Sequence, residues 1–313
     1  MLAVHADVTP VLRVARVGPG RFLLVDPIRW NSRPELRDPV MVCAFNGWND
    51  AGEAASAALG LILGDFGGNE VATIDAEEFF DFTAVRPTIR LIEGRTRVVD
   101  WPSNSFHAAH VPAAEHDLLL MRGTEPSLRW RAFNEAVIAV AEEMDVKMVV
   151  TLGALLADVP HTRPVAVTGI ASDERLVNKL GFQRSSYEGP TGVVGALHHA
   201  CQQHGMPSAS LWASVPHYVA AAPNPKAALA LIRAFEGLVG VAVDAAPLEE
   251  AAAEYERQVN EAVASDPEVK AFVERLEETM DEVTDALPDR LPSADTIARD
   301  FQRYLKQRGP GTE

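Results

Sequence analysis

Short apolar runs alternate with amphipathic segments along most of the chain. Residues 40–45 form an uninterrupted apolar run, which is typical of a strand covered on both faces. Ala55, Ala58, Leu59 and Ile62 follow at the spacing of one helix face. The same reasoning predicts further strands at 70–74, 88–92, 96–101, 106–110, 117–121, 147–152, 165–170 and 209–215. It predicts further helices at 128–143, 174–180, 191–204 and 225–238.

This order of elements predicts an α/β fold. Strands separated by helices indicate a mostly parallel, mixed sheet with helices on both faces, which gives three α/β/α layers. The segment 70–121 is rich in strands and is expected to add antiparallel pairs at one edge of the sheet.

The end of the chain is predicted to be helical and acidic. Residues 246–313 carry 17 acidic and 8 basic side chains, a net charge of −9 out of −16. We therefore expect an α/β domain over 1–245 and an acidic helical C-terminal extension over 246–313. One helix is predicted around 255–263, and another is expected from 293 to 309. Between them, an apolar stripe at helical spacing is formed by Val269, Phe272, Val273, Leu276, Met280 and Val283. This stripe is a candidate contact surface, either with a second copy of the chain or with the chain's own α/β domain.

Composition excludes several classes of protein. Of 313 residues, 47% are hydrophobic and 23% are charged, which is typical of a globular protein and excludes a chain disordered throughout. A net charge of −16 argues against nucleic-acid binding, which needs clustered Lys and Arg. No apolar run approaches the length of a membrane span, and no secretory signal is visible. Cys43 and Cys201 cannot form a disulfide framework, so we expect buried thiols and a cytoplasmic protein.

Polar turns follow several of the predicted strands. In parallel α/β sheets, ligands bind beyond the carboxyl ends of the strands, so we expect these turns to meet along one edge. The candidate ligand-binding residues in and near them are Asn46, Asp50, Glu125, His161, Glu188, Thr191 and His217.

Each candidate also has a structural interpretation. Asp50, with Glu53 three residues later, is interpreted first as the cap of a helix. His161 lies between two prolines, which indicate a rigid loop. That loop either directs the imidazole toward a ligand or serves only as a scaffold, and the sequence favours neither interpretation. Thr191 either caps the helix that follows or leaves its N–H groups for an anion. His217 beside Tyr218 is interpreted first as a hydrogen-bonded pair.

Common catalytic and cofactor motifs are absent from the sequence. We find no phosphate-binding loop, dinucleotide fingerprint, nucleophile elbow or paired Cys-x-x-Cys. His198, His199 and His204 do not have the spacing of metal ligands on one helix face. The sequence therefore predicts no cofactor and no metal.

Five motifs in this order carry a family resemblance: NGWNDAG (46–52), RGTEP (122–126), VPHTRP (159–164), YEGPTG (187–192) and VPHY (215–218). The chain resembles the bacterial branch of the proteasome assembly chaperone 2 family, particularly its actinobacterial members. The resemblance implies a phosphorylase/hydrolase-like three-layer fold, self-association into a homo-oligomer and a proteasome-related protein partner. Relatives that dock on the proteasome end in a hydrophobic-Tyr-any motif, whereas Thr312 stands at the tyrosine position here.

Two hypotheses of function follow. We favour a non-enzymatic assembly or protein-binding factor that acts as a homo-oligomer. The alternative is a small-molecule enzyme or sensor with an anionic or nucleotide-type ligand in a pocket at the strand ends. His161 or Glu188 would then serve as acid or base. The alternative requires the candidate side chains to enclose one pocket.

Overall fold

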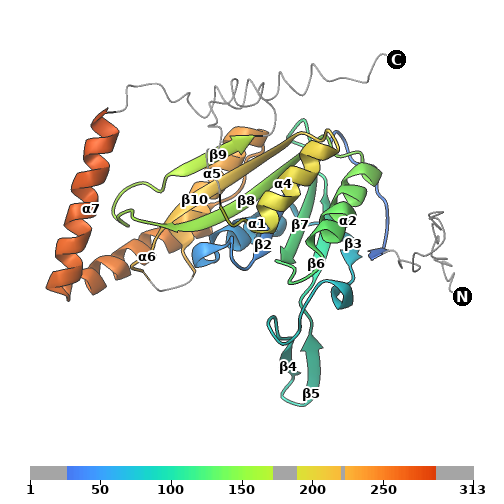
Figure 1. Cartoon of the computed structure of the whole chain (residues 1–313), viewed down its shortest axis with the longest axis horizontal. Helices are drawn as coiled ribbons and strands as arrows, with labels where there is room; N and C mark the ends of the chain where they lie inside the picture. The colour runs from blue at the N-terminus through green and yellow to red at the C-terminus, as the bar shows by residue number, and fades with distance from the viewer. Residues whose placement is uncertain (1–26, 172–188, 220–222, 287–313) are drawn as a thin grey trace, which may run out of the picture.

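The computed structural model describes residues 27–171, 189–219 and 223–286 (Figure 1). Side chains are described as far as residue 282. The strands are β1 (Ile28–Trp30), β2 (Val40–Asn46), β3 (Asn69–Ile74), β4 (Thr88–Ile92), β5 (Thr96–Asp100), β6 (Asn104–Ala109), β7 (Leu118–Thr124), β8 (Met148–Ala157), β9 (Val167–Ala171) and β10 (Ser208–Pro216). The α-helices are α1 (Ala54–Phe66), α2 (Trp130–Glu143), α4 (Val193–Gln203), α5 (Pro225–Val239), α6 (Ala246–Ala264) and α7 (Pro267–Ala286).

The main sheet has eight strands in the order β1-β3-β6-β7-β2-β8-β10-β9. The central strands β7, β2, β8 and β10 are mutually parallel. Antiparallel strands flank them: β6, β3 and β1 on one side and β9 on the other. The sheet is therefore mixed with a parallel centre, as the sequence predicts.

Helices cover both faces of this sheet and form three layers (Figure 1). On one face, α1 and α5 bury alternate side chains of the central strands, including Val42, Leu120 and Val150. On the other face, α2 and α4 bury the intervening positions, including Cys43, Met121 and Val149. Because β2, β7 and β8 are covered on both faces, their sequences are continuous apolar runs rather than alternating ones.

The structure confirms most of the predicted elements. Most differences at the ends are of a few residues, with two exceptions. β8 continues five residues beyond the expected end, to Ala157, and pairs with β10 as far as that residue. α6 begins at Ala246, nine residues before the helix predicted around 255–263. β1 was not predicted, because three residues are too short to show a period. The helices expected at 174–180 and 293–309 lie outside the described residues.

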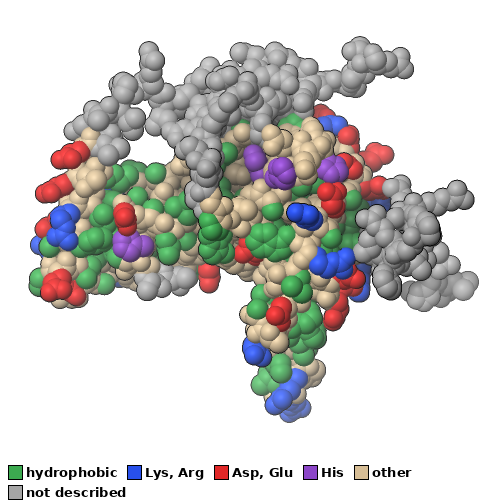
Figure 2. All heavy atoms as spheres, in the orientation of Figure 1, with side chains coloured by type: hydrophobic (Ala, Val, Ile, Leu, Met, Phe, Trp, Pro, Cys, Tyr) green, Lys and Arg blue, Asp and Glu red, His purple; other side chains and the backbone are tan. Residues whose placement is uncertain are grey.

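A two-stranded hairpin projects from the body, between β3 and β6 in sequence (Figure 1). We call residues 88–100, which form β4 and β5, the arm. Its side chains make no core of their own: Ile89, Leu91 and Val99 are 63%, 58% and 44% exposed. Figure 2 shows hydrophobic side chains along the arm and Lys or Arg at its tip. At the root, Phe82 and Trp101 meet edge to face with ring centroids 4.8 Å apart.

Candidate functional site

Four neighbouring strands end at one edge of the sheet. β7, β2, β8 and β10 lie side by side in this order and run in the same direction. The loops that follow them begin at residues 125, 47, 158 and 217, and we call the edge that they form the rim. The predicted convergence of these turns is confirmed. The contacts within the rim, however, divide the candidate residues into two groups.

Glu125 organises the first group. Its Oε1 accepts a hydrogen bond from the backbone N–H of Val193 at 2.8 Å, and its Oε2 accepts one from Trp48 at 3.2 Å. Its own N–H donates to the carbonyl of Asn46 at 2.9 Å. The carboxylate thus joins the loops after β2 and β7 to the first turn of α4. A negative charge is favourable at this position, because the first N–H groups of a helix lack intrahelical partners.

Thr191 does not cap α4, contrary to one sequence interpretation. The helix begins at Val193 with Gly192 as its N-cap residue, and Gly192 has no side chain that could cap it. Glu125 caps the first turn from another loop instead, so an N–H that an anionic ligand would need is already bonded. Gly192 is required for this approach, since a Cβ there would lie 2.0 Å from Oδ1 of Asn49 and 2.9 Å from Oε1 of Glu125.

Asp50 caps α1 in a different way from the predicted capping box. Its Oδ1 accepts from the N–H groups of Ala55 at 2.7 Å and Ser56 at 3.3 Å. Glu53 does not return a bond to Asp50, as a capping box requires: it takes the left-handed conformation with φ 51°, and the Asp50 N–H donates to the carbonyl of Gly47. Asp50 is only 7% exposed, and its burial raises the pKa of the carboxyl.

Asn49 is the buried rim residue that sequence reasoning missed. Its side chain is 1% exposed, and both atoms of its amide lack a hydrogen-bond partner among the described residues. Its carbonyl accepts from the N–H of Ala154, which ties the β2 loop to β8. In the sequence, Asn49 is one polar residue in a glycine-rich turn, and nothing there signals that it is buried.

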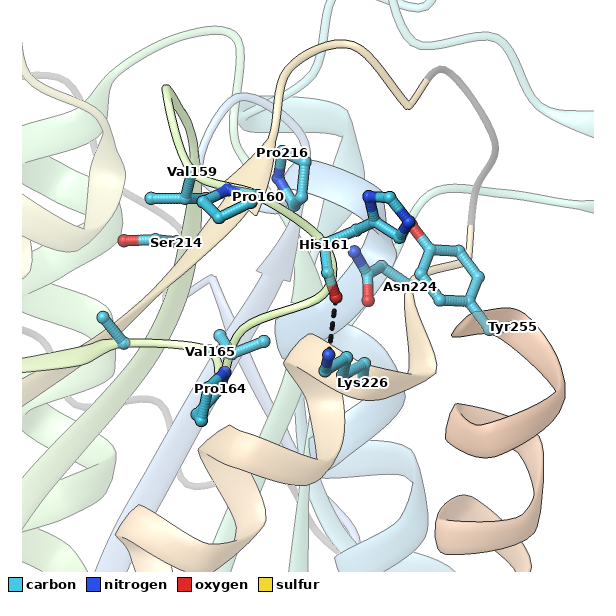
Figure 3. A pocket seen from close by; sticks show the side chains of 11 residues that line it. Val159, Pro160, His161, Pro164, Val165, Ser214, Pro216, Asn224, Lys226 and Tyr255 are labelled. Carbon is cyan, nitrogen blue, oxygen red and sulfur yellow. Dashed lines mark hydrogen bonds between the residues drawn. The ribbon is translucent and has the colours of Figure 1, made fainter. Parts of the chain in front are cut away.

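His161 is the centre of the second group (Figure 3). Its backbone N–H donates to the hydroxyl of Tyr218 at 2.7 Å, and the same hydroxyl lies 2.7 Å from the ring Nδ1. The ring Nε2 lies 3.0 Å from Oδ1 of Asn260 in α6. Lys226 of α5 donates to the His161 carbonyl and also pairs with Glu256 of α6. His161 is thereby held by a loop and two helices.

These contacts assign the proton of the imidazole. The Tyr218 hydroxyl accepts the backbone N–H and can donate to Nδ1, so the ring proton lies on Nε2 and is donated to Asn260. Burial, the largest cause, lowers the pKa of His161, and it raises the pKa of Tyr218. The histidine is therefore neutral near pH 7. With both ring nitrogens bonded within the protein, the imidazole has no free atom to serve as an acid or base.

His217 and the neighbouring loop contact the tail helices, by which we mean α6 and α7. The ring of His217 meets the rings of Tyr218 and Phe272 edge to face, with centroids 5.9 Å and 5.7 Å away. Its Nδ1 lies 3.0 Å from the exposed carboxylate of Asp158. The predicted hydrogen bond between His217 and Tyr218 is therefore wrong: their rings are in edge-to-face contact, and the polar atoms of each side chain have another partner.

Ionic contacts add to this docking. Arg163 makes a bidentate pair with Asp281 at 2.9 Å and 2.7 Å, and Thr162 donates to Glu277. Val273, in the apolar stripe of α7, is 5% exposed. Within the described side chains, this stripe therefore serves at least in part as an intrachain seam. Half of the rim is used to hold the chain's own C-terminal helices.

The remaining candidates do not complete a single pocket. Asn46 is exposed, and it lies with Asp50 beside a shallow depression next to α1. A separate narrow cavity is lined by His161, Lys226 and Tyr255 (Figure 3). Glu188 lies outside the described residues. The described residues thus place Asp50 and Glu125 around the β2 loop and His161 and His217 under the tail helices.

Other chemistry has little support in the described part of the chain. No group of three or more His, Cys, Asp or Glu that could hold a metal ion occurs among residues 27–171, 189–219 and 223–286. Cys43 and Cys201 are free and buried, and burial raises the pKa of both thiols, which makes them poor nucleophiles. No helix in the described segments is both long enough and apolar enough to cross a membrane.

Comparison with known proteins gives a consistent result. The family model described as the PAC2 family matches residues 44–263. It thus includes the rim and nearly all of α6, and it ends before α7. No curated protein matches the sequence.

Solved structures extend this likeness. A PAC2 family protein from Streptomyces avermitilis is 46% identical with a TM-score of 0.71, and the match covers 75% of this chain and all of that one. A Mycobacterium tuberculosis protein described as a proteasome-assembly chaperone homologue is 42% identical with a TM-score of 0.69, and the match covers 75% of this chain and 99% of that one. A second M. tuberculosis protein, of unknown function, is 28% identical with a TM-score of 0.76, over 95% of this chain and 100% of that one.

Proposed function

Because this chain belongs to the PAC2 family, we propose that it is a non-enzymatic protein-binding factor of the assembly type that works as a homo-oligomer. The mycobacterial relative described as a proteasome-assembly chaperone homologue supports a proteasome-related protein as the partner. The contact with other proteins is made by the arm.

One observation carries this proposal: the arm is an apolar surface held away from the core. Ile89, Leu91 and Val99 point to the same side of the hairpin, because Ile89 pairs with Val99 and Leu91 is two residues along the same strand. All three are exposed beyond 40%. A two-stranded hairpin alone is marginally stable in water, and contiguous exposed apolar surface is characteristic of protein-interaction sites.

The rim does not favour the small-molecule alternative. An enzyme or sensor would direct its polar groups toward a shared cavity. Glu125 instead bonds two backbone N–H groups, and His161 bonds Tyr218 and Asn260. We therefore assign these residues to holding loops and helices in place.

Affinity capture with matched variants tests the proposal. Full-length tagged protein would be compared with the double variant I89D/L91D and with the control T96D, which adds a charge on the opposite side of the hairpin. Quantitative mass spectrometry of actinobacterial lysate is expected to find proteasome subunits or another stoichiometric protein with wild type and T96D, reduced at least fivefold with I89D/L91D. Equal recovery with all three forms, or no stoichiometric protein with any, contradicts the proposal.

A further inference from the structure

A serine and a histidine form a hydrogen-bonded pair on β6, outside the rim. Ser105 and His107 are two residues apart, so their side chains lie on the same face of the sheet, while Phe106 between them packs in the core on the opposite face. The Oγ of Ser105 lies 3.0 Å from Nε2 of His107. Both side chains are half-buried and line a depression of about 380 Å³ beside α1. A molecule in this depression can therefore reach the pair.

The second nitrogen of His107 sets the direction of this hydrogen bond. Besides Ser105, the ring bonds the backbone of Gly68, and this bond raises the pKa of His107, as a bond to a carbonyl does. The ring proton therefore lies on Nδ1, and Nε2 accepts the hydroxyl proton of Ser105. Glycine is required for the approach, because a Cβ on Gly68 would lie 3.2 Å from the Cβ of His107.

Charged residues on both neighbouring strands lie beside the pair. Glu70 is directly opposite His107 on β3, and Arg122 is directly opposite Ser105 on β7. Burial, the largest cause, lowers the pKa of His107, while the charge of Glu70 raises it and that of Arg122 lowers it. The imidazole is therefore neutral at pH 7 and able to accept a proton. Once it has done so, Glu70 stabilises the imidazolium, and Arg122 stabilises negative charge that develops on a carbonyl oxygen next to Ser105.

Access distinguishes this pair from another one in the structure. The Oγ of Ser208 lies 3.0 Å from Nδ1 of His198, but Ser208 is only 1% exposed and its bond serves the core. Ser105 instead faces the depression, whose walls include the apolar side chains of Leu63 and Trp101. Such walls suit the hydrocarbon part of an acyl group. A nucleophile, its base and a place for the reacting group thus occur together.

We propose that Ser105 is a covalent acylation site, which takes its acyl group from an activated ester or thioester. The Oγ attacks the carbonyl carbon and forms a C–O bond, while its proton moves to Nε2 of His107. The bond from that carbon to the alcohol or thiol then breaks, and the leaving group takes the proton from the imidazolium. The products are one ester of Ser105 and one alcohol or thiol. This reaction goes beyond the proposed function and modifies the chain once, so it is compatible with a protein-binding role.

Acetylation by p-nitrophenyl acetate tests the proposal on the full-length chain. Peptide mapping by mass spectrometry is expected to find an acetyl group on Ser105. In His107→Gln, the rate at this serine should fall at least tenfold, because a positioned base contributes about 10²–10⁴-fold. Ser103→Ala is the control, since Ser103 is exposed nearby without a histidine partner among the described residues, and it should leave the rate at Ser105 unchanged. No acetyl group on Ser105, or an unchanged rate in His107→Gln, overturns the proposal.

The pH dependence distinguishes a base from a residue that only supports the fold. The rate of acetylation of Ser105 should rise as the pH increases through the pKa of His107, which lies below about 6.5, and then become constant. Glu70→Gln removes the charge that raises this pKa, so the midpoint of the rise should move to lower pH, while Arg122 is unchanged. A rate that increases with hydroxide concentration throughout, without a plateau, overturns the proposal.

A cysteine at the same position gives a measurement that keeps His107 in place. Ser105→Cys should react with iodoacetamide at pH 7 at least tenfold faster than Ser103→Cys, because His107 accepts the thiol proton and the thiolate is the nucleophile. The native Cys43 and Cys201 are buried and do not interfere. Equal rates for the two variants, both folded as judged by their Tm, overturn the proposal.

Discussion

Removal of the Glu125 carboxylate should loosen the rim by a predictable amount. In Glu125→Ala, the N–H groups of Trp48 and Val193 both lose their acceptor. A hydrogen bond to a charged group contributes about 1.5–3 kcal/mol, and one that is only half-buried lies at the low end. Two such bonds give a loss of about 3 kcal/mol in the free energy of unfolding, or roughly 5 °C in Tm for a chain of this size.

Glu125→Gln separates hydrogen bonding from bulk. Its single amide oxygen can serve one N–H, while its NH₂ group is turned toward the other N–H, so we expect a loss of about 2 kcal/mol. Glu35→Ala is the control, because Glu35 is exposed and pairs with no described residue. Urea denaturation gives the free energies of unfolding. The backbone amides of Trp48 and Val193 should exchange faster in both Glu125 variants than in wild type, and at the wild-type rate in the control.

The result also distinguishes the two roles considered for Glu125. If the carboxylate were directed at a ligand, its removal would leave the free energy of unfolding of the ligand-free protein unchanged or raise it. If Glu125→Ala unfolds within about 1 kcal/mol of wild type and the two amides exchange at unchanged rates, the structural assignment is refuted.

Three further predictions concern His161 in the rim, α7, which packs on the rim, and β8, which leads to it. Folding lowers the pKa of His161, mainly by burial, so the unfolded chain binds a proton near pH 6.5 that the folded chain resists. Stability should therefore fall as the pH is lowered through about 6.5, and fall less in His161→Gln, as thermal melts between pH 8 and pH 5 would show; parallel curves for the two proteins would contradict this. Phe272→Ala, which removes ring contacts with His217 and Tyr218, should speed hydrogen exchange in α7 and leave β2 unchanged, and equal protection of α7 would disprove the docking. Gly153→Ala should destabilise by about 1–3 kcal/mol in urea, because the new Cβ would lie 2.8 Å from the Trp212 ring, and an unchanged midpoint would rule out that close packing.

Local patterns predicted the fold well because its elements are locally encoded. The strand at Val40 is apolar on both faces, and the cap at Asp50 bonds N–H groups five and six residues later. Such features fall within one sequence window. Even the error at Glu53 is local, since a single left-handed residue breaks the capping-box geometry.

The roles of the rim residues are set by distant partners. Glu125 bonds Val193 across 68 residues, and His161 bonds Asn260 across 99. From the sequence alone, Thr191 was the expected cap of α4, because Glu125 lies far away in the chain and no nearby residue indicates its role. Likewise, His161 between two prolines gave no sign that α6 would cover it. The convergence of the loops followed from strand direction, whereas the bonds among them did not.

The arm is an insertion that can change while the body stays the same. β3 and β6 are adjacent in the sheet, and Ile74 lies opposite Asn104, so a short turn could join them. Phe79 and Phe80, before the arm, are buried and belong to the core, whereas residues 88–100 of the arm contribute no buried side chain to it. β4 and β5 form a separate sheet, so changes in the length or sequence of the arm leave the eight strands of the main sheet in place. Duplicated copies of such a gene would therefore change their protein partners through substitutions within a stretch of about fifteen codons.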